Sequence, residues 1–330
     1  MLKVGLIGCG YMGTMHANCY MALKDKVQLS AVADIRAEKA EEVAKLSDAE
    51  IYKSAEELIN NSDVDFVDIC LPTYLHERYA VMAMKKGFNV FVEKPLCRDK
   101  EEAERLIECQ KETGKTVQVG QVIRFWDEYV WLKKAKEENR FGKLISANLK
   151  RVSPRPEWAW ENWLHNPELS GGMALDMHIH DLDYMRYLMG EPKKIKVSGL
   201  EMDGLTEYIM TSYIYDDSVL IAECAWNYPK DFPFSMAYRV KFEKATVCFD
   251  TSLNTFIVYP NDGEPFTPEI EKRFEGMAGS GNISSLGGYY NELEYFINML
   301  ENPDLDNIAS LSEGARSVEL ALEGILMIKE

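Results

Sequence analysis

The sequence lacks the features of a membrane-spanning, disulfide-bonded or nucleic-acid-binding protein. No apolar segment approaches the roughly 20 residues that span a bilayer. The seven cysteines are odd in number and contain no C-x-x-C pair, which argues against a disulfide framework or a zinc site. Acidic residues outnumber basic ones by 54 to 37, and the net charge of −17 argues against nucleic acid as a partner. Because the first β-type run begins at residue 2, we expect no signal peptide and a cytoplasmic protein.

The composition is that of an ordinary globular protein, with 46% hydrophobic and 28% charged residues. A chain of 330 residues is too long for one small core, so we expect two domains, 1–122 and 123–330. The first 120 residues alternate short apolar runs with amphipathic helical patterns, which favours a doubly wound parallel sheet of the Rossmann type. The β-type runs are 2–7, 28–33, 66–70, 89–93 and 117–120, and the helical ones 12–23, 36–46, 54–60, 74–86 and 99–113.

The pattern changes after residue 122, where consecutive β-type runs predict a large open sheet, mixed and mostly antiparallel. The predicted strands are 144–152, 194–201, 206–215, 218–226, 236–242, 245–250 and 255–259, and the predicted helices 127–138, 174–189, 289–299 and 312–328. A long loop is expected over 260–288. One face of this sheet would lack cover from its own chain, so we expect a homodimer or homotetramer packed sheet to sheet. The alternative is a polar, solvated face.

The motif Gly8-Cys9-Gly10-Tyr11-Met12-Gly13 directly follows the first apolar run and opens a helical pattern. In this context it predicts a dinucleotide site. Gly8 permits the tight turn, Gly10 lets a pyrophosphate approach, and Gly13 lets helix and strand pack closely. The helix N-terminus would offer backbone N–H groups to the phosphates, with Tyr11 and Met12 in its first turn.

Asp34 closes the second apolar run, 21 residues after Gly13, and bears on which dinucleotide is bound. Its carboxylate would accept hydrogen bonds from the adenosine ribose and repel a 2′-phosphate, which favours NAD over NADP. Arg36 could pair with such a phosphate, so NADP stays open. Alternatively, Arg36 is a solvated residue at the start of the next helix.

Two further segments lie at the carboxyl ends of the predicted strands, where a doubly wound sheet binds its ligand. They are Leu71-Pro72-Thr73 and Glu93-Lys94-Pro95. A buried Lys94 could hydrogen-bond a reacting oxygen and exchange protons, and Pro95 could introduce a cis peptide bond. The alternative is a surface lysine beside a helix-starting proline.

A second polar cluster spans 171–183, GGMALDMHIHDLD. On a helix, Asp176 and His180 share one face, so the carboxylate could orient an imidazole that transfers protons. His178 would point elsewhere. No third ligand accompanies the pair, so we predict no metal site; capping and packing by polar residues is the plainer alternative.

These residues resemble the glucose–fructose oxidoreductase / inositol dehydrogenase / rhizopine-catabolism (Gfo/Idh/MocA) family over nearly the whole chain. The resemblance rests on G-C-G-Y-M-G at 8–13, L-P-T-Y-L-H at 71–76, E-K-P at 93–95, R-F at 124–125 and S-G-G-M-A-L-D-M-H-I-H-D-L-D at 170–183. It implies a Rossmann domain followed by an α/β domain, and a dimer or tetramer. It also implies that Lys94 and His180 flank the substrate carbon facing the nicotinamide, with Asp176 beside them.

The chain departs from many relatives at His178 and at Trp163-Leu164, so its substrate can differ from inositol or glucose. Trp158, Trp160, Trp163 and His165 could form a wall on which a sugar stacks, or could pack under a loop.

Together these observations predict an NAD(P)-dependent oxidoreductase acting on a secondary hydroxyl of a cyclic polyol, sugar or sugar derivative. The cofactor residues expected are Gly8, Gly10, Tyr11, Met12, Gly13, Asp34, Arg36, Thr73, His76 and Glu93; the substrate residues are Lys94, Arg124, Trp163, Asp176 and His180; and the catalytic ones are Lys94, Asp176 and His180. The alternatives are an NAD-using glycosidase without net redox chemistry and a non-catalytic NAD- or sugar-binding regulator.

Overall fold

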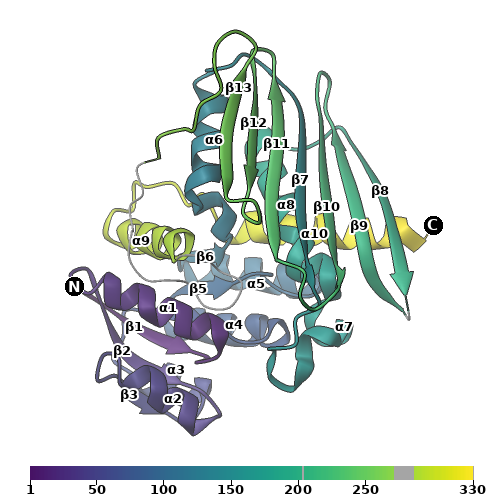
Figure 1. Ribbon diagram of the computed structural model, residues 1–330. Coiled ribbons are helices and arrows are strands. Elements are labelled where there is room, and N and C mark those ends of the chain that lie inside the picture. Colours follow the sequence, from purple (N-terminus) through teal and green to yellow (C-terminus); the bar gives the residue numbers. More distant parts are fainter. Residues whose placement is uncertain (203, 271–285, 330) are drawn as a thin grey trace. The chain divides into compact units, whose positions relative to one another are not determined.

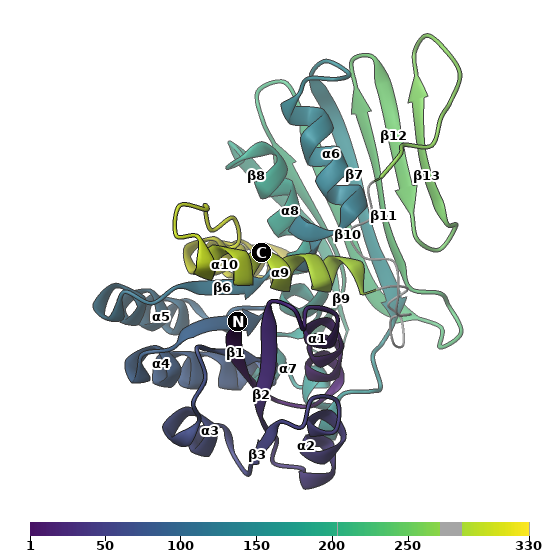
Figure 2. The ribbon, with the colours of Figure 1, turned by 90° about the vertical axis from the view of Figure 1, so that its left-hand side faces the viewer.

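The computed structural model describes residues 1–202, 204–270 and 286–329. The described residues divide into two units, shown in Figures 1 and 2. Unit 1 contains 1–125 and the described part of 273–318, and unit 2 contains the described part of 126–272 and the end of the chain from 319. The division therefore assigns a late segment, with helix α9 (Gly287–Glu301), to the N-terminal unit.

Unit 1 is built on a parallel sheet of six strands in the order β3-β2-β1-β4-β5-β6. The strands are β1 Leu2–Ile7, β2 Val27–Ala33, β3 Glu50–Tyr52, β4 Phe66–Ile69, β5 Asn89–Glu93 and β6 Val117–Gly120. This confirms the predicted doubly wound sheet. Because β1 pairs with both β2 and β4, the order of the strands reverses beside it, and a ligand crevice is expected at its carboxyl end.

Local capping chemistry sets the ends of some helices of unit 1. They are α1 Tyr11–Ala22, α2 Ala37–Ala44, α3 Ala55–Asn61, α4 His76–Lys86 and α5 Lys100–Thr113, with 3₁₀ turns at Thr73–Leu75 and Val122–Phe125. Asp99 caps α5 by accepting a hydrogen bond from the backbone N–H of Glu102, and Gly114 ends it at φ +65°. Helices α1 and α9 contribute to one apolar core, where Phe66 and Phe91 each meet Phe296 edge to face.

Unit 2 carries a seven-stranded sheet in the order β13-β12-β11-β7-β10-β9-β8. Its strands are β7 Leu144–Pro154, β8 Lys194–Met202, β9 Leu205–Ile214, β10 Val219–Tyr228, β11 Ser235–Phe242, β12 Ala245–Asp250 and β13 Thr255–Pro260. Only the β7–β10 pair among these described strands is parallel, which confirms the predicted mixed, mostly antiparallel sheet.

Helices α6 (Asp127–Glu137) and α8 (Ile179–Met189) lie on one face of this sheet (Figure 2). Tyr129 of α6 packs edge to face on Tyr184 of α8 and Tyr238 of β11. On the opposite face, side chains such as Tyr208, Met210 and Ile221 are only half-buried.

The segment predicted as one α-helix over 174–189 is not uniform. Ala174–His178 forms a π-helical turn, and α8 starts only at Ile179. The prediction of an α-helix was wrong for this turn, because apolar periodicity does not distinguish a π-bulge from an α-helix.

The remaining elements are a 3₁₀ stretch at Trp160–His165, α7 (Pro167–Ser170) and α10 (Leu311–Lys329). Most of the loop predicted over 260–288 lies outside the described residues. Within the described ranges, no helix combines the length and apolarity needed to cross a membrane.

Candidate functional site

The turn after β1 admits no side chain at two of its three glycines. Gly8 has φ +94°, and a Cβ there would lie 2.5 Å from the carbonyl oxygen of Cys70. A Cβ on Gly13 would lie 1.8 Å from the carbonyl oxygen of Gly8. Both positions therefore require glycine, one for the backbone turn and one for the close packing of α1 on that turn.

Gly10 is different, because the protein leaves room at this position. The nearest atom to a Cβ there would be Nη2 of Arg36, at 3.6 Å. Gly10 is also the N-cap of α1, and as a glycine it supplies no capping side chain. The open space and the positive end of the helix fit a pyrophosphate that approaches the backbone.

Asp34 lies at the end of β2, beside this turn. Its Oδ2 accepts a hydrogen bond from the Cys9 N–H at 2.8 Å, and its Oδ1 accepts one from the Arg36 N–H at 2.8 Å. The Arg36 guanidinium also donates to both oxygens, at 3.1 and 3.0 Å. The carboxylate is thus held at the crevice with its arginine neighbour already paired to it.

The Glu93-Lys94-Pro95 turn lies at the end of β5, and the Lys94–Pro95 peptide bond is cis. Glu93 is buried, and its Oε2 accepts a hydrogen bond from the backbone N–H of Lys94 at 3.0 Å. His76 lies between two loops: Nε2 contacts the Leu71 carbonyl at 2.7 Å and Nδ1 the Pro95 carbonyl at 2.8 Å.

Burial lowers the pKa of His76, although both carbonyls favour its cation. The neutral ring donates to one carbonyl at a time. Thr73 is buried in the turn just before α4. Thr73 and His76, both predicted to bind the cofactor, are therefore buried beside the loops that follow β4 and β5.

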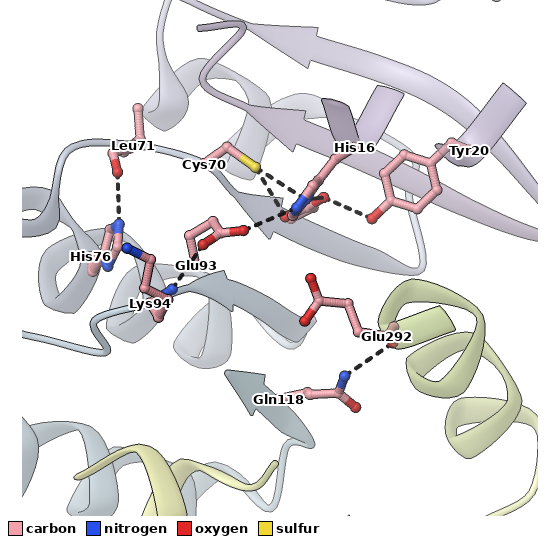
Figure 3. A network of polar contacts seen from close by, with 10 residues as sticks. His16, Tyr20, Cys70, Leu71, His76, Glu93, Lys94, Gln118 and Glu292 are labelled. Atoms are coloured by element: carbon pink, nitrogen blue, oxygen red, sulfur yellow. Dashed lines mark hydrogen bonds and ion pairs between the residues drawn. The ribbon is translucent and has the colours of Figure 1, made fainter. Parts of the chain in front are cut away.

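A polar network that the sequence analysis did not identify lies under this turn (Figure 3). It contains His16 of α1, Asp68 of β4 and Glu292 of α9, all buried. Nε2 of His16 lies 3.0 Å from Oε1 of Glu93 and so connects the network to the turn. His16 and Glu292 lie in helices that we predicted, and each has an aromatic residue four positions later, so the sequence hinted at their burial but not at their proximity.

Arg124, predicted to bind substrate, is buried in unit 1 and already paired. Its Nη2 contacts Glu313 at 3.0 Å, and its Nη1 donates to the Ile308 carbonyl. Burying a guanidinium requires such partners. These contacts fasten the 122–125 turn to the start of α10.

In unit 2, the residues Asp176, His178 and His180 of the second motif differ in burial. Asp176 in the π turn and His180 in α8 are half-buried, whereas His178 is fully buried with its Nε2 2.9 Å from the Thr211 hydroxyl. Burial and then the charge of Arg151 lower the pKa of His178 to about 3, so this ring stays neutral. Asp181 forms a buried ion pair with Arg151 at 2.9 Å.

The aromatic segment of unit 2 is exposed. Trp158 and Trp160 are 55% and 37% exposed, and Trp163 is half-buried. His165 contacts the Pro156 carbonyl through Nε2 at 2.6 Å. The two outer tryptophans are thus partly exposed to solvent, and both alternatives for this segment stay predictions.

Unit 1 thus has the geometry of a dinucleotide-binding α/β domain, and a separate α/β unit with a mixed sheet follows it. A family model described as "Oxidoreductase family, NAD-binding Rossmann fold" matches residues 2–121, and one described as "GFO/IDH/MocA C-terminal domain" matches residues 129–248. The chain therefore belongs to the Gfo/Idh/MocA oxidoreductase family, and its N-terminal part is an NAD-binding Rossmann domain.

Known proteins similar to this chain carry several activities. Myo-inositol 2-dehydrogenase of Thermotoga maritima is 34% identical over 191 residues, 58% of this chain and 55% of that protein. The 2,7-anhydro-N-acetylneuraminate hydratase of Escherichia coli is 30% identical over 206 residues, 60% of this chain and 53% of that protein. These alignments thus span about half the length of the relatives.

A solved structure, levoglucosan dehydrogenase in complex with NADH and levoglucosan, is similar with a TM-score of 0.87. The comparison covers 99% of this chain and 97% of that one at 19% identity, so the likeness concerns the fold.

Proposed function

We propose that this protein is an NAD-dependent oxidoreductase that acts on a secondary hydroxyl of a cyclic polyol, sugar or sugar derivative. The observation that carries the proposal is the E-K-P turn at the carboxyl end of β5, on the same sheet edge as the glycine turn and Asp34. The relatives named as inositol and sugar dehydrogenases support the class of substrate. Membership of the family supports the class of reaction.

NAD is preferred over NADP because Asp34 places a carboxylate at the end of β2, where a 2′-phosphate would meet its negative charge. The Arg36 side chain occupies two acceptor positions of this carboxylate and would yield them to the ribose hydroxyls when NAD binds. The room at Gly10 and the uncapped start of α1 fit the pyrophosphate.

The reaction needs one group that moves a proton and one that stabilises charge on oxygen. When bound, NAD supplies the hydride acceptor. We assign proton removal from the hydroxyl to His180, a hydrogen bond to the developing oxyanion to Lys94, and support of the local charge to Asp176. His180 and Lys94 could exchange the first two roles.

The Lys94→Ala and His180→Ala variants test this assignment. Each should lower turnover at least ~10²-fold with NAD binding nearly intact, as for general acid–base groups. His178→Asn is the matched control, because it removes a buried, neutral imidazole two residues before His180. This control should lower thermal stability but keep turnover per folded molecule. Wild-type turnover in either alanine variant would remove that residue from the mechanism.

A second candidate function is a reaction without net redox, in which NAD is used transiently during cleavage of a sugar derivative. The relative named as a hydratase of an anhydro sugar favours keeping this candidate. Product formation without accumulated NADH would distinguish it.

We further propose that the protein assembles as a homodimer or homotetramer through the face of the unit 2 sheet opposite α6 and α8. Half-buried apolar side chains of β9 and β10 on that face, including Tyr208, Met210 and Ile221, support the proposal.

A further inference from the structure

Beneath the E-K-P turn, one imidazole lies between two carboxylates. Nδ1 of His16 is 2.8 Å from Oδ2 of Asp68, and Nε2 is 3.0 Å from Oε1 of Glu93 (Figure 3). The Tyr20 hydroxyl donates to the same Asp68 oxygen at 2.8 Å. The other Glu93 oxygen accepts the hydrogen bond from the Lys94 N–H. A continuous chain of polar contacts therefore runs from the core side of α1 to the backbone of Lys94.

The contacts of His16 define its charge. Nδ1 is hydrogen-bonded to Asp68, whereas Nε2 lies within ion-pair distance of Glu93 without a hydrogen bond to it, so a protonated ring would meet a carboxylate at each nitrogen. Burial alone would lower the pKa of His16, but Cys70 and Asp68 beside it raise the pKa well above its usual value. The Cys70 sulfur lies 3.2 Å from Nδ1, and burial raises the pKa of this thiol. The carboxyl groups that face the ring are Asp68 at Nδ1 and Glu93 at Nε2.

Glu292 is the third acid of this cluster and has a different environment. It is fully buried on α9, and neither carboxyl oxygen has a hydrogen-bond partner among the described residues. Its carboxyl oxygen, Nε2 of His16 and an oxygen of Glu93 lie within 4.8 Å of one another. Asp68 and Glu93 already outweigh the one imidazolium, so ionising Glu292 would bury a second uncompensated negative charge.

We propose that His16 and Glu292 are positioning residues for the Glu93–Lys94 turn. The protonated His16 ring attracts one oxygen of Glu93 and so fixes the Glu93 side chain. Glu292 packs against these two residues as a neutral acid and adds no charge. The other Glu93 oxygen then fixes the backbone direction at Lys94. The link to catalysis rests on the proposed function, whereas the protonation of Glu292 does not.

The main rival occupant of the cluster is a metal ion, because one imidazole and two carboxylates are also a ligand set. The two interpretations differ in the state of Glu292, which is a neutral acid in one and an anionic ligand in the other. Glutamine has the shape and charge of the protonated acid, so Glu292→Gln separates them.

The first experiment compares thermal unfolding of the wild type and Glu292→Gln between about pH 5 and about pH 8. Burial, with a smaller contribution from Glu93, raises the pKa of Glu292 well above 4.5, while His16 opposes the shift. The folded state then keeps a proton that the unfolded chain releases, so this group's contribution to stability falls as the pH rises between the two pKa values. Gln does not titrate. The difference in Tm, variant minus wild type, should therefore increase with pH.

Other groups face Glu292 and are present in both proteins, so the difference reports the titration of residue 292 together with its coupling to them. They are Cys19 and His16 of α1, Asp68, Glu93 and Tyr289 of α9, and the Gln118 amide of β6 donates to the backbone carbonyl of Glu292. Glu102→Gln is the matched control, because Glu102 is a buried acid with an ionic partner, Arg98. It should lower the Tm throughout this range.

Two results would overturn the neutral acid. One is a Tm difference for Glu292→Gln that stays constant or falls with pH. The other is stoichiometric metal in the purified wild type, measured by elemental mass spectrometry, that the variant loses.

The second experiment measures kcat, KM and NAD affinity in His16→Gln, Glu292→Gln and Tyr20→Phe. His16→Gln should lower kcat by about tenfold to hundredfold through misplacement of Lys94, with a smaller change in KM. Glu292→Gln keeps the shape and neutrality of the protonated acid, so it should lower kcat less than His16→Gln does. Tyr20→Phe removes the outermost contact and should lower stability more than kcat.

Wild-type kcat in a folded His16→Gln protein would overturn the positioning role while Lys94→Ala remained inactive. Wild-type kcat in Lys94→Ala would instead refute the proposed function and leave the pH-dependent result for Glu292 standing.

Discussion

Arg36 donates two side-chain hydrogen bonds to Asp34, from Nε to Oδ1 at 3.1 Å and from Nη2 to Oδ2 at 3.0 Å. The same carboxylate also holds the N–H of Cys9 inside the glycine turn. One acid thereby holds the turn and pairs with Arg36, at the sheet edge where we propose that NAD binds.

Replacing Asp34 with serine should change the cofactor preference. Asp34→Ser loses the carboxylate that would bind the ribose hydroxyls and releases Arg36 for a 2′-phosphate. We expect KM for NAD to rise at least about tenfold, the scale for loss of a charged hydrogen bond, and KM for NADP to fall. Steady-state kinetics with both cofactors measures the switch.

The double variant Asp34→Ser/Arg36→Ala is the control for this switch. It should weaken NAD use to the same extent but show no gain with NADP. An equal gain with NADP in the single and double variants would contradict the role of Arg36.

Gly10→Ala and Gly13→Ala are a matched pair with opposite expectations. A methyl group at residue 13 would overlap the Gly8 carbonyl, so Gly13→Ala should lower the Tm sharply or prevent folding. At residue 10 the protein leaves space, so Gly10→Ala should keep the Tm of the free protein and weaken NAD binding. Thermal unfolding and calorimetric titration with NAD separate the two effects. Undiminished NAD binding by Gly10→Ala would contradict a pyrophosphate at this position.

Asp181, within the second motif, should act in stability and not in the reaction. Arg151→Met leaves the buried carboxyl without its partner and should cost about 3–5 kcal/mol in urea unfolding. The double variant Arg151→Met/Asp181→Leu should regain most of this loss and keep turnover. A folded but inactive double variant would show instead that this ion pair belongs to the reaction.

Charge on the outer face of the unit 2 sheet should dissociate the assembly. Met210→Lys and Ile221→Lys each add a cation to a half-buried apolar position and should give a smaller species by light scattering. Leu253→Lys, at an already exposed position, should not. A monomeric wild type would refute the proposed oligomer.

The fold could be predicted largely from the sequence because its elements follow simple periodicities. The buried parallel strands are nearly continuous apolar runs, and β3 escaped prediction because it has three residues, two of them exposed. The π turn before α8 also escaped, since its pattern is that of a helix.

The glycine turn, Asp34 and the E-K-P turn could be predicted because each follows a strand at the same sheet edge. His16 and Glu292 could not, because 276 residues separate them and only α9 packing beside α1 in one core brings them together. The partners of Arg124 were hidden for the same reason, since Ile308 and Glu313 come from a distant segment. These contacts arise from long-range packing, which the local sequence pattern does not encode.

The measurement that tests the central claim most directly is NADH formation from NAD across a panel of inositols, hexoses, pentoses, uronates and amino sugars. NADP should be run alongside, and NAD binding should be confirmed by calorimetry. The account predicts that NADH accumulates with at least one cyclic polyol or sugar and that Lys94→Ala abolishes the signal. Turnover of a sugar derivative without NADH, or no reaction in a protein that binds NAD, would contradict it.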